Sequence, residues 1–411
     1  MNRMHNRGAA GLLLLTIMAS PLPAQTQAEF QEWRHTLVDK VLVPSGIKDP
    51  RVVRSMRDTP RHEFLPPKLH KLSYYDMGLP IGEKQTMSSP LIVAQMTQAL
   101  KPAATDKVLE IGTDSGYQTA VLSPLVKDVN TIEIVDALGK KAKHALDRLG
   151  YQNVHAKVGD GYLGWPEFAP FNKIIATCSP EKVPQPLIDQ LADGGIMVVP
   201  VGERYSQTLY LFTKKQGKLE REALLPTVFV PMTGKAEDSR EHKPDLANPH
   251  LVNGSFEEEP HFVSAGGQPG WYYERQVTRR TSDQAPDGKH YIEFKNSEPN
   301  RGANLFQSFA LDGRKVSKIE VSGWVKTENV ADQQRGLPPS INITLFDELR
   351  QKVKLPQPMI IVPFVGTSGW HLVYKTFLVP KEAREGIMGI GLFGATGIAC
   401  FDKLEMKKAA K

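Results

Sequence analysis

The sequence predicts an α/β domain built on a doubly wound parallel sheet, followed by an all-β sandwich domain. Its 411 residues exceed one ordinary core, because domains cluster at about 100–200 residues. Between residues 89 and 213, short apolar strands alternate with helical stretches, which is typical of a parallel sheet covered by helices. Beyond residue 249 the helical period disappears, and short strands separated by Gly, Pro and Asn turns follow, as in a β-sandwich.

The N-terminus has the layout of a secretory signal peptide. A positively charged start precedes an apolar run over residues 8–19, and a small residue, Ala24, stands at the expected cleavage site. The run is shorter than the roughly 20 residues of a membrane-spanning helix, so no transmembrane segment is expected. Residues 1–24 therefore predict a periplasmic or secreted protein beginning at Gln25, and a cytoplasmic protein is the alternative.

The composition excludes some classes of function. A net charge of +6 is mild for this length, and no basic stripe indicates nucleic-acid binding. Cys178 and Cys400 fall in different predicted domains, so neither a disulfide nor a cysteine metal site is expected. The eleven histidines show no metal-ligand spacing, and we expect no metal.

The first predicted domain covers residues 25–234. Two helical stretches at 29–42 and 49–57 precede the alternating region. Further helices are predicted over residues 90–100, 117–125, 137–149 and 183–191, and strands over 107–111, 129–134, 154–158, 171–177, 196–201 and 208–213. Residues 235–249 are polar and aperiodic and predict a linker.

The second predicted domain covers residues 250–408. One strand places Ile319, Val321 and Val325 on the same face, because side chains alternate along a strand. Strands are predicted over residues 291–294, 303–311, 317–326, 340–346, 370–379 and 389–393.

A glycine-containing loop follows the first strand of the alternating region. Gly112 and Gly116 let the backbone approach a ligand, and Glu133 at the end of the next strand is placed to take ribose hydroxyls. The alternative is a tight turn beside an ordinary surface acid. Spacing alone also leaves open whether the ligand is a nicotinamide cofactor or S-adenosylmethionine.

Ordered motifs resolve that choice. Residues 81–90 are IGEKQTMSSP, and LEIGTDSGYQTAVL begins at Leu109. They are followed by IEI at Ile132, VGDGYLGW at Val158, PVG at Pro200 and FVP at Phe229, and preceded by PRHEFLP at Pro60 and by Tyr75-Asp76. Over about residues 50–232 the chain resembles the protein-L-isoaspartate O-methyltransferase family. The resemblance implies a class I S-adenosylmethionine-dependent methyltransferase fold. It also implies methyl transfer to the free carboxylate of L-isoaspartyl residues in damaged proteins, a repair reaction.

The resemblance assigns roles to particular residues. Ser88 matches the active-site serine that orients the incoming carboxylate, and Thr86 lies near the methyl group. The residues implied to wrap the methionine part of the cofactor are Glu110, Gly112, Thr113, Ser115 and Gly116, while Glu133 binds the ribose and Asp160 and Gly161 meet the adenine. The alternative role for Ser88 is a helix N-cap, for which Ser89 is better placed.

Two departures from the family pattern leave other functions open. Asp114 replaces the middle glycine of the family's GxGxG loop, a tolerable change because Asp enters left-handed conformations at modest cost. Its carboxylate either favours the sulfonium charge or clashes with the cofactor's own carboxylate. Glu83-Lys84 replaces the usual aromatic-glycine pair. The alternatives are a methyltransferase of another carboxylate or small molecule, and a non-catalytic binding protein with a degenerate loop.

The second domain resembles galactose-binding-like jelly-roll sandwiches of the carbohydrate-binding-module type. The motifs are residues 251–257, Pro269-Gly270-Trp271, Gly323-Trp324-Val325, and Trp370 followed by Val379-Pro380. Trp271, Tyr272, Tyr273 and Trp370 are either packing residues or platforms for a sugar ring. A glycan, a polymer and the first domain all remain open as its partner. Cys178 is interpreted as an inert buried thiol.

Overall fold

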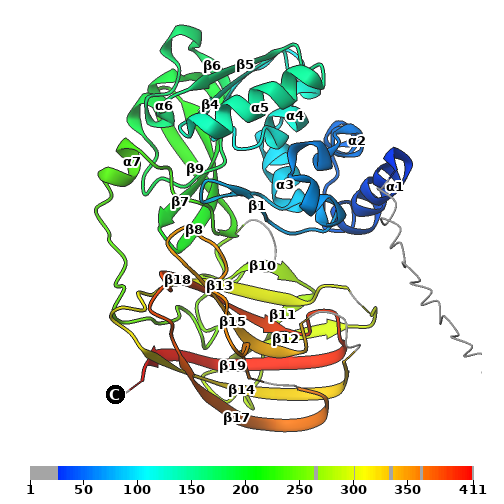
Figure 1. Cartoon of the computed structure of the whole chain (residues 1–411), viewed down its shortest axis with the longest axis vertical. Coiled ribbons are helices and arrows are strands. Elements are labelled where there is room, and N and C mark those ends of the chain that lie inside the picture. Colours follow the sequence, from blue (N-terminus) through cyan, green and yellow to red (C-terminus); the bar gives the residue numbers. More distant parts are fainter. Residues whose placement is uncertain (1–25, 263–266, 300, 333–336, 362–363, 410–411) are drawn as a thin grey trace, which may run out of the picture.

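The protein consists of an α/β domain stacked on a β-sandwich along the longest axis of the molecule (Figure 1). The computed structural model describes residues 26–262, 267–299, 301–332, 337–361 and 364–409. The predicted signal peptide, residues 1–24, lies outside the described residues. Among the described helices, none is both long and apolar enough to span a membrane.

Short helices open the α/β domain. Helix α1 (Gln27–Leu37) begins at Thr26, which forms a capping box with Glu29, and it continues into a π-helical turn, η1 (Val38–Leu42). Helix α2 (Pro50–Asp58) starts with a proline at its first position, where no backbone N–H is needed. Two 3-10 turns follow, η2 (Arg61–Phe64) and η3 (Pro67–Leu72).

A seven-stranded sheet with the order β5-β4-β3-β6-β7-β8-β9 forms the centre of the domain. Its strands are β3 (Lys107–Ile111), β4 (Asp128–Glu133), β5 (Val154–Val158), β6 (Phe171–Ala176), β7 (Leu191–Glu203), β8 (Ser206–Lys215) and β9 (Lys218–Thr227). The first five strands are parallel, whereas β8 and β9 pair antiparallel. The sheet is therefore mixed, not wholly parallel as the strand–helix alternation predicted. Two-residue turns on either side of β8 leave no room for a crossover helix, so the chain returns as hairpins.

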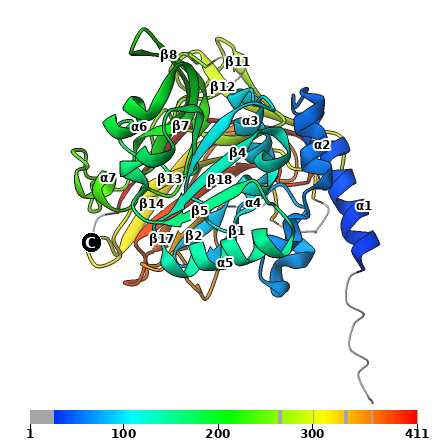
Figure 2. The ribbon, with the colours of Figure 1, turned by 90° about the horizontal axis from the view of Figure 1, so that it is seen from above.

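Helices cover the sheet as the alternation predicted. They are α3 (Pro90–Leu100), α4 (Tyr117–Leu122), α5 (Asp136–Arg148) and α6 (Gln185–Gln190). Helix α5 buries Leu138, Ala142 and Leu146, one side chain per turn, against the sheet. In both ribbon views α1 and α2 lie on the opposite side of the domain from α6 (Figures 1 and 2).

The segment predicted as a linker starts with a helical turn, α7 (Lys235–Asp238), that packs on the α/β domain. The buried Arg240 side chain donates from Nη1 to the carbonyl oxygen of Gly202 at 3.0 Å. The backbone N–H of Lys235 donates to Asp160 Oδ2 at 2.9 Å. The first part of this segment thus belongs physically to the α/β domain.

Two five-stranded antiparallel sheets form the second domain, which confirms the predicted all-β sandwich. Their orders are β10-β13-β18-β15-β16 and β11-β12-β19-β14-β17. The strands are β10 (Tyr272–Arg275), β11 (Val277–Thr281), β12 (His290–Asn296), β13 (Asn304–Ala310), β14 (Lys318–Ala331), β15 (Ser340–Phe346), β16 (Met359–Ile361), β17 (Gly366–Leu378), β18 (Glu385–Gly391) and β19 (Thr396–Lys408). Trp271 is fully buried and Tyr272 is 4% exposed, so both are packing residues and not sugar platforms. Trp370 lies edge-on to Tyr291, with ring centroids 5.3 Å apart.

Candidate active site

A small pocket, which we call the strand-end pocket, lies at the carboxyl ends of β3, β4 and β6. Ligands of open α/β sheets bind at this edge. Its wall consists of apolar side chains, two glycines and a few polar residues, together with two carboxylates. The lining residues are Gln85, Ile111, Gly112, Asp114, Ile132, Glu133, Ile134, Gly161, Thr177, Cys178, Val230, Pro231, Met232 and Thr233.

Left-handed backbone conformations shape the loop between β3 and α4. The φ angles are 93° at Gly112, 51° at Asp114 and 92° at Gly116. Asp114 therefore adopts a left-handed conformation, which favours glycine but which aspartate enters at modest cost. A Cβ atom on Gly112 would lie 2.4 Å from Thr177 Oγ1. This contact explains why glycine is required there.

Glu133 is fixed at the end of β4 by two backbone hydrogen bonds. Its Oε2 accepts from Asp114 N at 2.8 Å, and its Oε1 accepts from Val135 N at 2.9 Å. Each carboxylate oxygen has a second lone pair, so the side chain can still accept hydroxyl donors from a ligand. This geometry fits the ribose-binding role predicted for Glu133.

Two further carboxyl groups lie close by. Glu110 is fully buried and accepts a hydrogen bond from the Thr119 hydroxyl; burial raises the pKa of Glu110 to about 7. Burial and the neighbouring carboxylates of Glu133 and Glu110 raise the pKa of Asp114 well above its ordinary value. The acidic groups thus hold protons more tightly than free carboxyls do.

The second glycine of the pocket follows Asp160. Asp160 is the N-cap of a 3-10 turn, η5 (Gly161–Leu163): its Oδ1 accepts from Tyr162 N at 2.9 Å, and Oδ2 accepts from Lys235 N. Gly161 lines the pocket, and a Cβ there would lie 2.3 Å from Ile111 Cγ2. Asp160 therefore shapes the loop, and Gly161 keeps it close to β3.

The structure separates the predicted cofactor residues into two groups. Gly112, Glu133 and Gly161 line the strand-end pocket, whereas the others do not, and Thr86 lines the cleft beside Ser88. The Thr113 hydroxyl bonds to that of Thr131 at 2.6 Å, and Gly116 approaches Leu146. The members that do not line the strand-end pocket are Thr86, Glu110, Thr113, Ser115, Gly116 and Asp160.

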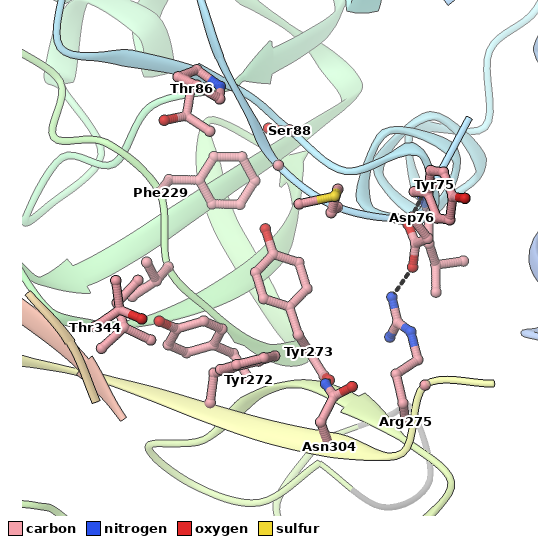
Figure 3. Close-up of a pocket in the computed structure, with 18 of the residues that line it drawn as sticks. Tyr75, Asp76, Thr86, Ser88, Phe229, Tyr272, Tyr273, Arg275, Asn304 and Thr344 are labelled. Atoms are coloured by element: carbon pink, nitrogen blue, oxygen red, sulfur yellow. Dashed lines mark hydrogen bonds and ion pairs between the residues drawn. The ribbon is translucent and has the colours of Figure 1, made fainter. Parts of the chain in front are cut away.

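Ser88 follows a two-stranded hairpin, β1 (Leu79–Gly82) and β2 (Gln85–Met87). The turn residues Glu83 and Lys84 have φ angles of 51° and 62°, as in a type I′ hairpin turn, and both are exposed. The Ser89 side chain caps α3 by accepting from Ile92 N at 3.5 Å. The capping role falls to Ser89, and the half-buried Ser88 borders the space between the domains (Figure 3).

Arg61 is a site residue that was not predicted from the sequence. Its guanidinium is fully buried, and Nη2 donates to the carbonyl oxygen of Ser88 at 2.8 Å. The group lies 4.7 Å from the centroid of the Tyr117 ring, and burial lowers the pKa of Arg61. A positive charge therefore lies directly behind Ser88. Its place in the motif PRHEFLP was the available signal.

The space beside Ser88, which we call the interdomain cleft, has a volume of about 2240 Å³. On the side of the α/β domain its lining includes Thr86, Ser88 and Phe229. On the side of the sandwich it includes Tyr273 and Arg275 from β10 (Figure 3). The cleft is large enough for a peptide segment.

The pocket and the cleft meet at three residues. Gln85, Thr177 and Val230 line both. A ligand in the strand-end pocket and a second ligand in the cleft would therefore approach each other here. Neither Gln85 nor Thr177 was predicted from the sequence as a site residue, although Thr177 directly follows β6, where such folds place ligand contacts.

Comparison with known proteins identifies the family. The family described as protein-L-isoaspartate(D-aspartate) O-methyltransferase matches residues 32–237, half of the chain. The chain belongs to the protein-L-isoaspartate O-methyltransferase family. A relative from Gloeobacter violaceus is 46% identical over 207 residues, covering 50% of this chain and all of that protein. One from Dictyoglomus turgidum is 49% identical over 202 residues, covering 49% and 91%. Both are named protein-L-isoaspartate O-methyltransferase.

A solved structure from Plasmodium falciparum is also similar. It is described as a protein-L-isoaspartate O-methyltransferase in complex with S-adenosyl-L-homocysteine, covers 49% of this chain and 98% of that one, and is 23% identical with a TM-score of 0.43. The Gloeobacter violaceus methyltransferase is matched over its whole length by half of this chain, so it has no counterpart of the β-sandwich.

By the charge of its lining, the strand-end pocket suits S-adenosylmethionine, the methyl donor of this methyltransferase family. Its lining contains the carboxylates of Asp114 and Glu133 and, among the residues described there, no lysine or arginine. A sulfonium and an ammonium group are favoured by such a wall, whereas the pyrophosphate of a dinucleotide is not. In the described parts of the chain, no group of three or more His, Cys, Asp or Glu side chains is arranged to hold a metal ion.

Cys178, which also lines the pocket, behaves as a buried thiol. It is 9% exposed, and burial together with Asp114 raises its pKa well above the ordinary value. Both cysteines are free, as the sequence predicted. A neutral thiol is a poor nucleophile, so Cys178 contributes surface and not chemistry.

Proposed function

We propose that the protein transfers a methyl group from S-adenosylmethionine to the free carboxylate of L-isoaspartyl residues in proteins. The observation that carries the proposal is the junction at Gln85, Thr177 and Val230, three residues that line both the acidic strand-end pocket and the cleft of peptide size beside Ser88. Membership of the family and the names of its relatives support this reaction.

The acceptor needs no strong base. An isoaspartyl carboxylate is already ionised near pH 7, because carboxyl groups titrate near 4. The Ser88 hydroxyl donates a hydrogen bond to one carboxylate oxygen and so orients the other toward the junction. The buried charge of Arg61, bonded to the Ser88 carbonyl oxygen, favours an anion at this place.

The donor needs a fixed position. When bound, S-adenosylmethionine supplies a methyl group on a positively charged sulfur. Glu133 accepts hydrogen bonds from the ribose, and Gly112 and Gly161 let two loops lie close to the ligand. Alignment of the two ligands and exclusion of water then supply most of the rate acceleration.

The test is methyl transfer by the chain from Gln25 onward, with labelled S-adenosylmethionine and an isoaspartyl peptide. We expect transfer to this peptide and not to its aspartyl isomer. Ser88→Ala should lower kcat/KM about 10-fold to 100-fold, the cost of one orienting hydrogen bond to a charged group. Ser282→Ala, in the turn after β11, is the matched control and should leave the rate unchanged.

The same assay decides between this function and two others. Equal transfer to both isomers would mean a methyltransferase of another carboxylate, for which the exposed Glu83-Lys84 turn would set the substrate. No transfer to any peptide, together with no binding of S-adenosylmethionine by calorimetry, would mean a non-catalytic binding protein.

We also propose that the protein is exported. The support is the charged, then apolar, then small-residue pattern of residues 1–24. N-terminal sequencing of the protein from its native cells should find Gln25 as the first residue. An intact Met1 would contradict export and favour the cytoplasmic alternative.

A further inference from the structure

The edge strand of the sandwich that faces the interdomain cleft is irregular at one point. Strand β10 pairs with β13 at Tyr272↔Phe306 and Arg275↔Asn304, so β10 has one residue more than its partner between these pairs. Within this bulge Tyr273 has a φ of 55°. A bulge redirects side chains, and a left-handed conformation is costly for a bulky residue. Something in the surroundings must compensate this cost.

Two hydrogen bonds hold the bulge. Asn304 Nδ2 donates to the carbonyl oxygen of Tyr273 at 3.1 Å. The preceding side chain, Tyr272, stays in the sandwich, where its hydroxyl bonds to Ser308 Oγ at 2.6 Å. The bulge thus leaves one tyrosine in its own domain and turns the next one out of it.

Tyr273 points across the cleft toward the methyltransferase domain. Its ring extends from β10 toward Phe229 and Ser88, with the hydroxyl leading (Figure 3). It packs against the apolar core cluster of the first domain, to which Phe229 belongs, and remains half-buried. Burial and the carboxylate of Asp76 raise the pKa of Tyr273 to about 12, so at neutral pH the hydroxyl is a hydrogen-bond donor.

A partly buried ion pair joins the two sides of the interdomain cleft. Arg275, two residues after Tyr273, pairs with Asp76, whose side chain is only 8% exposed (Figure 3). Asp76 Oδ1 also accepts from Leu91 N at 2.9 Å, in the first turn of α3, just after Ser88. The sandwich is therefore anchored to the segment that carries the proposed active-site serine.

We propose that the β-sandwich completes the substrate site, with Tyr273 contacting the isoaspartyl-containing peptide segment opposite Ser88 and the Arg275–Asp76 pair holding this wall in place. The inference rests on the proposed methyl transfer and names where the acceptor lies. The aromatic ring covers the peptide backbone beside the isoaspartyl residue, and the hydroxyl donates to a peptide carbonyl. The matched Gloeobacter violaceus relative lacks this second wall.

Steady-state kinetics with an isoaspartyl hexapeptide test the proposal on the chain from Gln25 onward. Tyr273→Ala should raise the KM for the peptide about tenfold, the loss typical of a central tyrosine contact. The affinity for S-adenosylmethionine, measured without peptide, should stay unchanged. The peptide KM of Tyr273→Phe should lie between the values of wild type and Tyr273→Ala, and it measures the contribution of the hydroxyl alone. Tyr374→Ala, which removes a tyrosine 74% exposed on β17, should behave as wild type.

A second pair of variants separates the effect of the Arg275–Asp76 domain contact from the effect of the Tyr273 ring. Arg275→Met should raise the peptide KM by loosening the domain contact. Arg280→Met is its control, because Arg280 pairs with Glu293 and both residues belong to the sandwich domain. Folded Tyr273→Ala and Arg275→Met variants with the wild-type KM would overturn the inference while leaving the methyl transfer intact. If the variants bound the peptide and S-adenosylmethionine equally less tightly, this would also overturn the inference, since it would show a merely structural role. An inactive wild-type chain would instead refute the proposed function.

Discussion

The buried carboxyl of Glu110 makes the stability of the methyltransferase domain depend on pH. Its pKa is raised from 4.5 to about 7 by burial, which at 1.36 kcal/mol per unit corresponds to about 3 kcal/mol. The native state binds this proton more tightly than the unfolded chain. The stabilisation is therefore fully present below pH 4.5 and is lost as the pH rises through 7.

Glu110→Gln removes this dependence, because the amide stays neutral and its oxygen can still accept from the Thr119 hydroxyl. The variant should be more stable than wild type by less than about 1 kcal/mol at pH 5 and by about 3 kcal/mol at pH 8. For a domain of about 200 residues this difference is a gain of about 6–12 °C in melting temperature. Scanning calorimetry without ligand measures this difference.

The control is Glu222→Gln, which neutralises an exposed carboxylate on β9 of the same domain. It should change the melting temperature by less than about 2 °C at either pH, because exposed charges contribute little. If the difference in melting temperature between Glu110→Gln and wild type were the same at pH 5 and pH 8, the Glu110 carboxyl would not titrate in this range. The account of Glu110 would then be wrong.

Three further variants probe the strand-end pocket. Gly161→Ala places a Cβ 2.3 Å from Ile111 Cγ2, so the affinity for S-adenosylmethionine should fall about tenfold by calorimetry, and wild-type affinity would contradict the close packing. Asp114→Asn should lower the affinity for S-adenosylmethionine about tenfold at pH 8. The affinity for S-adenosylhomocysteine should fall less, because only S-adenosylmethionine carries the sulfonium charge. Equal losses for both ligands would exclude that attraction. Thr177→Val removes the hydroxyl that donates to the Gly112 carbonyl oxygen at 2.6 Å and should cost about 1–3 kcal/mol in thermal unfolding. Thr177→Ser should retain most of that stability, and a Val variant as stable as Ser would refute the role of the bond.

Local patterns were sufficient to predict most of the α/β domain. Helix α5 was predicted at 137–149 and lies at Asp136–Arg148, because its apolar spacing and the glycine after it are both local signals. The antiparallel edge was not predicted, since strand β9 alternates weakly and the turn at Gln216 and Gly217 decides its direction. Pairings within the sandwich, such as Asn304↔Gly391, join residues far apart in sequence and leave no local trace.

The residues of the candidate site also fall into those that local motifs predict and those that they do not. Ser88 and Glu133 were predicted because each stands in a contiguous motif at a strand or hairpin end. Arg61 was not predicted as a site residue, and Tyr273 was named only as a packing residue or a sugar platform, because the importance of both depends on tertiary packing. Arg61 becomes relevant only when the chain folds back 27 residues onto the Ser88 carbonyl oxygen, and Tyr273 only through a bulge and the docking of a second domain.

The distribution of charge around the junction argues for a cationic donor and an anionic acceptor. On one side, Asp114 and Glu133 give the strand-end pocket an acidic wall that favours a sulfonium. On the other side, Arg61 lies behind Ser88 without exposure to solvent, so its charge is little screened where a carboxylate would arrive. Two ligands of opposite charge are thus drawn toward Gln85 and Thr177 from opposite directions. A cationic acceptor would meet repulsion from Arg61, and an anionic donor would meet it from the pocket. The arrangement therefore selects both partners of carboxyl methylation before any contact specific to isoaspartate is made.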